Sequence, residues 1–314
     1  MDSQVQAAGL PGAQAASSSD DKIWAALAHG SAVLFFIGPV VPLIMWLMQR
    51  KKSPYAAFQA LQAMLYQSLG FWVWILFVPV IIVVVLSVAM VLITVMSPRS
   101  ENLSLAVLGM QLAIFGGVIG SMLLYMAIGV IGAVASLMGR DFRYPFFGGR
   151  LARHLEYQGA QGGDLSDEKQ DYVVTSVCHS TVVILFWGLI TPIVVWLTQQ
   201  QRSAFLRFQA MQAAIYQGLG LLAYFATMGL YVLGMFGFMG AAITLDQSSQ
   251  SAAPAWVAAA MIPLLCLGCG VALVVPLYHL FGFLAALATL RGRDYRYPIL
   301  GQILASRMQP AEAK

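Results

Sequence analysis

The chain has 314 residues, of which 60% are hydrophobic and only 10% are charged, and its mean hydropathy is +0.77. Soluble domains carry about 25% charged residues, so this composition excludes a water-soluble enzyme. A membrane-spanning helix needs roughly 20 apolar residues. Four longer segments carry no Asp, Glu, Lys or Arg: residues 65–96, 105–138, 208–245 and 247–290. We therefore expect an all-α integral membrane protein. The net charge is +4, and three cysteines do not provide a disulfide framework.

The sequence contains an internal duplication. Residues of the first half recur 150 positions later, as His29 and His179 or Trp46 and Trp196 do, and so does Phe-Gln-Ala at 58–60 and 208–210. Farther on the offset is 153, where the heptad at 139–145 (Gly-Arg-Asp-Phe-Arg-Tyr-Pro) returns at 292–298 with one Phe-to-Tyr exchange. Ordered matches of this kind predict two homologous membrane repeats. The predicted organisation is a disordered tail (1–21), repeat 1 (22–153), a polar linker (154–168), repeat 2 (169–307) and a C-terminal tail (308–314).

Each repeat contains three hydrophobic segments, about six in all. The first (about 23–48 and 172–198) is interrupted by Gly38, Pro39 and Pro42 in repeat 1 and by Gly188 and Pro192 in repeat 2. Glycine and proline favour a bend at these positions. The second segment is a long helix (54–96 and 203–245). The third (103–138 and 256–290) is expected to stop at the glycine that opens each heptad.

The basic residues favour a first segment that enters the membrane and returns. If it does, all 17 Lys and Arg except Arg99 lie on one side, whereas a full crossing divides them eight against nine. The positive-inside rule then places the basic side in the cytoplasm. We expect Gln49, Gln201 and the C-terminal tail on that side, and Arg99 and Ser249 opposite. A segment of about 26 residues is also long enough for one straight crossing, so that alternative stays open.

A polar stripe begins the second segment of each repeat. Gln59, Gln62 and Tyr66 share one helix face by their i, i+3, i+7 spacing, with Gln67 at its margin. Amides near hydrocarbon are costly unless they are paired. We expect hydrogen bonds across helices, to His29 or to the bend near Pro39; lining a polar passage is the alternative. Repeat 2 carries the same set: His179, Gln209, Gln212, Tyr216 and Gln217. Each histidine is expected to be neutral and bonded to a backbone carbonyl at the bend.

The two heptads predict basic corners at the membrane surface, because arginine binds lipid phosphate and tyrosine favours the headgroup layer. The Asp is expected to brace one Arg while the other meets phosphate. The expected partners are the lipid bilayer, with anionic headgroups, and other membrane proteins or further copies of the chain. The headgroup residues are Arg140, Asp141, Arg143 and Tyr144, with Arg293, Asp294, Arg296 and Tyr297.

Other motifs give weaker signals. Cys266 and Cys269 are interpreted as small packing residues, and His279 has no counterpart in repeat 1, where Met126 stands. No catalytic, nucleotide-binding or metal-binding motif occurs in its expected context. We expect no enzymatic activity, no metal or other cofactor and no nucleic-acid partner.

Several of these motifs carry a family resemblance. Pro42-x-x-x-Trp46 before a basic loop, Ser-Pro followed by Phe-Gln-Ala-x-Gln-Ala and Tyr-Gln (53–67), and the closing heptad resemble a bacterial family of unknown function. That family groups with the Tic-twenty subunit of the chloroplast inner-envelope translocon and with the magnetosome protein MamF. The resemblance covers residues 22–150 and 169–303. It implies a multi-pass protein, in the bacterial plasma membrane, that acts as a scaffold or in polypeptide or solute passage. The alternative is a membrane-shaping or compartment-organising protein with re-entrant wedges.

Overall fold

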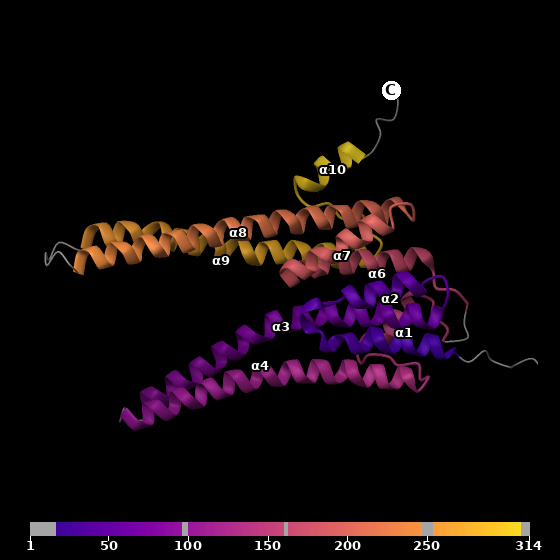
Figure 1. Cartoon of the computed structure of the whole chain (residues 1–314), viewed down its shortest axis with the longest axis horizontal. Coiled ribbons are helices and arrows are strands. Elements are labelled where there is room, and N and C mark those ends of the chain that lie inside the picture. Colours follow the sequence, from indigo (N-terminus) through magenta and orange to yellow (C-terminus); the bar gives the residue numbers. More distant parts are fainter. Residues whose placement is uncertain (1–16, 96–99, 160–162, 247–253, 309–314) are drawn as a thin grey trace, which may run out of the picture. The chain divides into compact units, whose positions relative to one another are not determined.

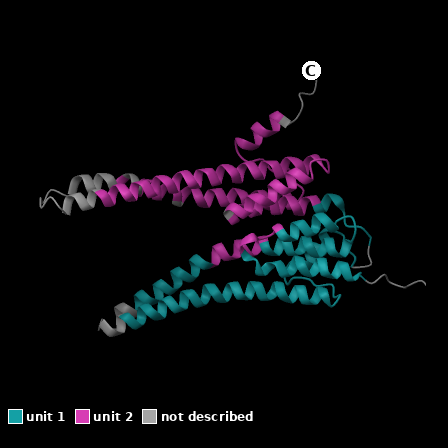
Figure 2. Cartoon of the chain, in the orientation of Figure 1, with its two compact units in different colours: residues 1–35, 41–67, 78–170 teal, residues 36–40, 68–77, 171–314 magenta. Residues whose placement is uncertain are grey.

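The computed structural model describes residues 17–95, 100–159, 163–246 and 254–308, and within these ranges the regular elements are helices, with no strand. The chain divides into two compact units (Figure 2). Unit 1 comprises residues 1–35, 41–67 and 78–170, and unit 2 comprises residues 36–40, 68–77 and 171–314. Each unit therefore contains most of one sequence repeat.

The helices follow the same order in both repeats (Figure 1). Repeat 1 contains α1 (Ser19–Gly30), the 3-10 turns η1 (Ser31–Val33) and η2 (Phe35–Ile37), α2 (Val40–Gln49), α3 (Pro54–Val95), α4 (Ser100–Leu137) and α5 (Gly148–His154). Repeat 2 contains α6 (Asp167–Ser180), η3 (Thr181–Ile184), α7 (Leu185–Thr198), α8 (Ala204–Asp246), α9 (Pro254–Leu290) and α10 (Leu300–Met308).

Four helices, α3, α4, α8 and α9, are long and apolar enough to cross a membrane. Their bounds lie within three residues of the expected second and third segments. Their outer surfaces are apolar: Val73 and Leu76 on α3 and Leu124 on α4 are each more than 60% exposed. Such a surface is stable only in lipid or against another protein. The prediction of an all-α membrane protein built from two repeats is confirmed.

The first segment of repeat 1 is a helical hairpin. Ser18 caps α1 in a capping box with Asp21, so the helix begins inside the expected N-terminal tail. Lys22 lies against Gly139, at the end of α4. The Tyr55 hydroxyl donates to the Arg140 carbonyl (3.1 Å), which places the start of α3 at the same end. Because α2 leads directly into α3, α1 enters the unit at this end and α2 returns to it.

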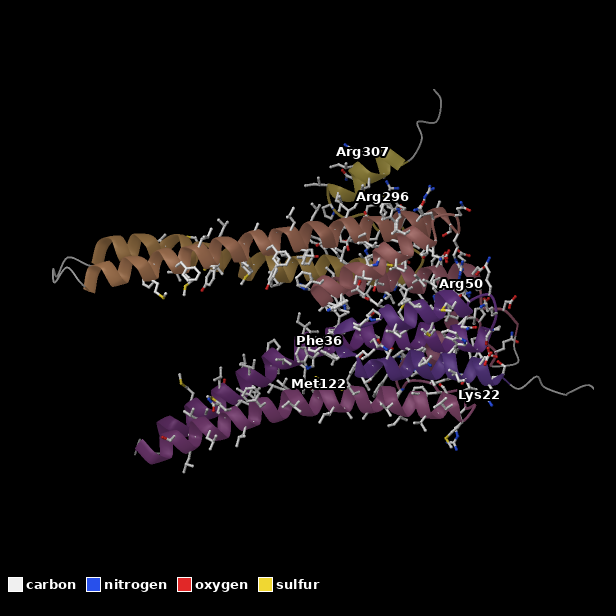
Figure 3. All side chains as sticks on the ribbon, in the orientation of Figure 1. Lys22, Phe36, Arg50, Met122, Arg296 and Arg307 are labelled. Carbon is white, nitrogen blue, oxygen red and sulfur yellow. The ribbon has the colours of Figure 1, made fainter. Side chains whose placement is uncertain are left out.

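This basic end is visible in Figure 3, where Lys22 and Arg50 lie at one end of unit 1 and Met122 lies part-way along α4. The turn of the hairpin is found deeper in the unit. Gly129 and Gly132 of α4 let α1 approach closely, because a Cβ at either position would collide with Ala32 or crowd the His29 ring. The hairpin thus packs against only part of the length of α3 and α4.

The break in repeat 2 lies earlier than expected. We expected it at Gly188 and Pro192, but η3 breaks the segment at 181–184 and both residues lie inside α7. Gly188 still serves the break, because a Cβ there would collide with the Thr181 carbonyl. Repeat 1 has Pro39 where repeat 2 has Leu189, so α2 starts only at Val40 and its break is longer.

The expected helix stops are confirmed. Gly139 and Gly292 adopt φ values of +74° and +72°, which L-residues with a side chain rarely adopt. The amide of the following arginine donates back to the carbonyl of Ala135 or Ala288 (both 3.0 Å), as in a Schellman cap. The chain therefore reverses at each glycine and runs back over the start of α3 or α8. Short helices α5 and α10, which we did not predict as helices, follow this reversal.

Candidate functional site: two buried polar networks

Each repeat contains one buried polar network. In repeat 1 it consists of His29 on α1, Gln59 and Gln62 on α3, and Asp141 and Tyr144 from the heptad. In repeat 2 it consists of His179, Gln209, Gln212, Asp294 and Tyr297. Both histidines and all four glutamines have no exposed surface. We call these sets the histidine–glutamine networks.

His29 bonds two side chains and not a carbonyl at the bend, so that expectation is wrong. Gln59 Nε2 donates to Asp141 Oδ1 (3.0 Å), which fixes the orientation of the amide. Its Oε1 must then accept from His29 Nε2 (2.8 Å), and His29 Nδ1 accepts from the Tyr144 hydroxyl (2.9 Å). Burial, and to a lesser degree the nearby Tyr66 and Tyr125, raise the pKa of Tyr144, so the hydroxyl stays protonated and donates. His29 is a neutral imidazole with both nitrogens bonded.

Gln62 fixes the backbone of the heptad. Its Oε1 accepts from the Tyr144 amide (2.9 Å), and its Nε2 donates to the Phe142 carbonyl and to Gln59 Oε1 (both 3.0 Å). Gly148 makes this possible, because a Cβ there would collide with Gln62 Oε1. One amide therefore holds a non-helical segment that has no ladder of its own to satisfy its polar groups.

Gln67 holds the end of α1. Its Nε2 donates to the Ala28 carbonyl (3.2 Å) and to Ser31 Oγ (2.8 Å). The last carbonyls of a helix lack partners within the helix, so this amide satisfies one of them at the turn of the hairpin. In repeat 2 Gln217 donates in the same way to the Cys178 carbonyl (2.6 Å).

Three stacked tyrosine rings continue the network toward the spanning helices. Tyr66 stacks on Tyr144 (4.0 Å between ring centroids) and on Tyr125 (5.0 Å), and its hydroxyl donates to the Tyr125 carbonyl (2.8 Å). We did not expect Tyr125 here. The signal in the sequence is its recurrence as Tyr278, at the same offset of 153 as the heptads.

The second network repeats these bonds and adds one, from Gln209 Nε2 to the Tyr295 carbonyl (3.0 Å). His179 lies 2.9 Å from Gln209 Oε1 and 3.0 Å from the Tyr297 hydroxyl, and Gln209 Nε2 lies 2.7 Å from Asp294 Oδ1. Tyr216 stacks on Tyr297 at 3.7 Å and on Tyr278 at 4.8 Å. The network is therefore common to both repeats.

Each heptad has two parts: its arginines lie at the surface and its tyrosine lies in the core. As expected, Asp141 binds Arg143 (2.9 Å) and Asp294 binds Arg296 (3.0 Å), and the arginines that precede them, Arg140 and Arg293, are exposed. Tyr144 and Tyr297 are only 2% and 1% exposed, so the expectation that they lie among headgroups is wrong. The reversal at the preceding glycine turns these rings inward.

The remaining candidate residues do not form a site. His279 Nδ1 lies 2.8 Å from the Val275 carbonyl of its own helix. Cys266 and Cys269 are exposed, so they do not pack within the chain as we expected. Among the described residues no group of three or more His, Cys, Asp or Glu is arranged to hold a metal ion. The histidines and glutamines of the networks are buried and bonded, and only the aspartates at the edge reach the surface. The networks hold the hairpin and the heptad against the long helices.

One family model matches each of the two repeats over nearly its whole length. The model of the magnetosome magnetite crystal formation protein family, which includes MamF and MmsF, matches residues 20–151 and again residues 170–304. The chain belongs to this family. No curated protein and no solved structure matches it.

Membership in the family confirms the resemblance to MamF and the tandem duplication. Each match begins at the first helix of a repeat and ends in the short helix after the heptad. Every member of both histidine–glutamine networks lies inside a match. The network is thus a feature of the family unit as this chain carries it, and not of the linker or the tails.

Proposed function

We propose that the protein is a non-enzymatic membrane-shaping protein that organises a bacterial membrane compartment by inserting two re-entrant hairpins into one leaflet. The observation that carries this proposal is the depth of the hairpins relative to the long helices. A membrane-shaping wedge must be wider in one leaflet than in the other. The family description, which names the magnetosome, supports a compartment membrane as the place of action.

The long helices have enough length to cross the membrane beyond the hairpins. Residues 73–95 of α3, 23 in number, rise about 35 Å at 1.5 Å per residue, which exceeds the roughly 30 Å of hydrocarbon. The corresponding residues 223–246 of α8 are 24 in number. The hairpins and the networks are therefore expected at the headgroup level of one leaflet, where four helices of a repeat lie together and only two continue.

The hairpins expose apolar side chains suited to shallow insertion. Leu27 and Phe36 are 51% and 73% exposed in repeat 1, and Phe186 and Trp187 are 52% and 45% exposed in repeat 2. Amphipathic segments of this kind bind in the interface with their apolar face among the upper acyl carbons. Basic residues at the open end of the hairpin, such as Lys22 and Arg50, meet the anionic surface of the same leaflet.

The first experiment tests the topology. Two crossings per repeat return the chain to its starting side, so Gln49→Cys and Gln201→Cys are both expected to be protected from an impermeant thiol reagent in intact cells. Arg99→Cys and Ser249→Cys, at positions outside the described residues, are expected to be labelled. The three native cysteines are first replaced by Ala. Labelling of Gln201→Cys without Gln49→Cys would show inverted repeats and would contradict the proposal.

The second experiment tests shaping directly. Purified protein is reconstituted into giant vesicles, and its density on a pulled membrane tether is compared with that on the flat membrane. Enrichment is expected on the tether for the natural protein and loss of enrichment for the variant Leu27→Gln, Phe36→Gln, Phe186→Gln, Trp187→Gln. The matched control replaces the same four residues by Met or Leu and is expected to keep the enrichment. Equal sorting of all three proteins would overturn the proposal.

Passage of a polypeptide or solute is the competing function, and it has less support. A polar path requires amides that face an opening, whereas Gln59, Gln62 and their counterparts are buried with both amide atoms bonded. Release of a trapped fluorescent solute from vesicles that contain the protein, at a rate reduced by Gln62→Ala, would favour passage over shaping.

A further inference from the structure

The two repeats differ on the outer face of the helix that carries the polar stripe. In unit 1 this face of α3 is covered by Tyr157, which follows α5. The Tyr157 ring stacks on Phe58 (4.0 Å between centroids, 12° between planes), and its hydroxyl donates to Asp141 Oδ1 (3.3 Å). Burial, together with the Asp141 carboxylate, raises the pKa of this hydroxyl, so it remains a donor. Tyr157 thus covers the exposed edge of the repeat 1 network, at Phe58 and Asp141, from within the same chain.

In unit 2 the same place is an open pocket of about 240 Å³. Its walls include Phe208, Asp294 and Ala305, the counterparts of the three residues that hold Tyr157: Phe58, Asp141 and Ala152. The full lining is Ala204, Phe205, Arg207, Phe208, Asp294, Arg296 and Ala305. We call it the Arg207 pocket.

Exposure shows that this part of unit 2 is uncovered. Phe58 has no exposed surface, whereas Phe208 is only half-buried. The Asp294 side chain is 47% exposed, against 30% for Asp141. At the offset of 153 the residue that corresponds to Tyr157 is Pro310, and the printed sequence contains no aromatic residue after Tyr297. Repeat 2 has kept the walls of the site without the tyrosine that fills it.

The charge of the pocket has also changed. Arg207 stands where repeat 1 has the buried Ala57, and the Arg296 guanidinium lies 5.9 Å from the centre of the Phe208 ring. Two arginines against one aspartate leave the pocket positive, which favours an acidic occupant. In repeat 1 the residue before Tyr157 is itself acidic, Glu156.

We propose that the Arg207 pocket binds a tyrosine from an acidic segment of a partner protein, in the way that repeat 1 binds its own Tyr157. The ring stacks on Phe208, the hydroxyl donates to Asp294 Oδ1, and the neighbouring carboxylate pairs with Arg207. An aromatic wall and an aspartate favour a phenol over a lipid phosphate, because the carboxylate repels an anion and hydrogen-bonds a hydroxyl. This site is independent of the wedge and adds protein recruitment to it.

The test measures binding of a fluorescein-labelled peptide, Asp-Leu-Glu-Tyr-Gln-Gly, to the full chain in phosphatidylcholine nanodiscs by fluorescence anisotropy. We expect one site per chain. Phe208→Ala and Arg207→Ala are each expected to weaken binding at least tenfold, and so is replacement of the peptide tyrosine by Ala. Arg291→Ala, an exposed arginine outside the pocket, is the matched control and is expected to leave binding unchanged.

A second variant uses the duplication itself. Tyr157→Ala is expected to open the equivalent place in repeat 1 and to add a second site at least tenfold weaker than the first, because repeat 1 has Ala57 where repeat 2 has Arg207. If this variant does not fold, the Arg207→Ala measurement still decides. Binding that is unchanged by both Phe208→Ala and Arg207→Ala would overturn the proposal. So would absence of peptide binding together with retention of phosphatidylglycerol that depends on Arg207, which would make the pocket a headgroup site.

Discussion

The two repeats agree in their buried networks and differ at the rim. Every bond from the histidine to the glutamines and the heptad tyrosine is present in both, with donor–acceptor distances that differ by at most 0.3 Å. The cover supplied by Tyr157 in unit 1 has no described counterpart in unit 2. The difference teaches that the buried network and its cover are separable: both repeats form the network, and the described part of unit 2 forms it without the cover.

The largest loss of stability is expected at Phe58, whose cover is the feature in which the repeats differ. Phe58→Ala removes a fully buried ring and is expected to lower the free energy of unfolding by about 3–5 kcal/mol. Phe208→Ala removes a half-buried ring and is expected to cost roughly 1 kcal/mol or less. Urea unfolding in mixed micelles, followed by far-UV circular dichroism, compares the two. Equal losses would show that both rings are equally covered and would contradict the difference between the two repeats.

Substitutions in the histidine–glutamine networks, which the repeats share, are expected to lower stability by a similar amount in both. Gln59→Leu or Gln209→Leu removes the acceptor of the buried imidazole Nε2–H and one of the two acceptors of the second glutamine's amide, at a cost of about 2–3 kcal/mol in either repeat. Amide hydrogen exchange locates the loss in the matching hairpin. Ser68→Ala, which changes a residue of α3 outside the network, serves as the control. A loss of stability in only one repeat would show that the two networks do not contribute equally to the free energy of unfolding.

The smallest effect concerns the glycine that opens α5. Gly148→Ala places a methyl group against Gln62 and is expected to destabilise the protein by about 1–3 kcal/mol through overpacking. The adjacent Gly149→Ala meets no atom within 4 Å and is expected to be neutral or to stabilise α5 by up to about 1 kcal/mol. The same unfolding titration applies. Equal behaviour of the two variants would mean that the heptad is not held against Gln62.

The parts of the fold that depend on local chemistry were predictable from the sequence. The long uncharged stretches of the sequence predict α3, α4, α8 and α9. Gly139 and Gly292 mark the ends of α4 and α9 because glycine adopts that backbone conformation most readily. The burial of Tyr144 was not predictable, because it depends on the direction the chain takes after the glycine. In isolation, a tyrosine beside arginines and a proline is typical of a headgroup anchor.

The partner of His29 depended in the same way on long-range geometry. Spacing placed Gln59 and Gln62 on one helix face, but it gave no information on which element of the fold lies opposite that face. We misplaced the break in repeat 2 because glycine and proline usually favour a bend, whereas here both lie inside α7. Gly188 instead leaves room for the Thr181 carbonyl of η3. The Arg207 pocket was not predictable from the sequence, because it depends on whether another part of the chain covers Phe208 as Tyr157 covers Phe58.

The hairpin of each repeat has a consequence for how this chain could be duplicated. Because both ends of a repeat lie at the same basic end, a further copy can be joined through a short polar linker without turning any existing helix upside down. An odd number of crossings would force every second copy into the opposite orientation, and its arginines would then have to be redistributed. With two crossings per repeat, as proposed above, duplication in this chain leaves the sidedness of the basic residues unchanged, and the second copy is free to diverge at its surface.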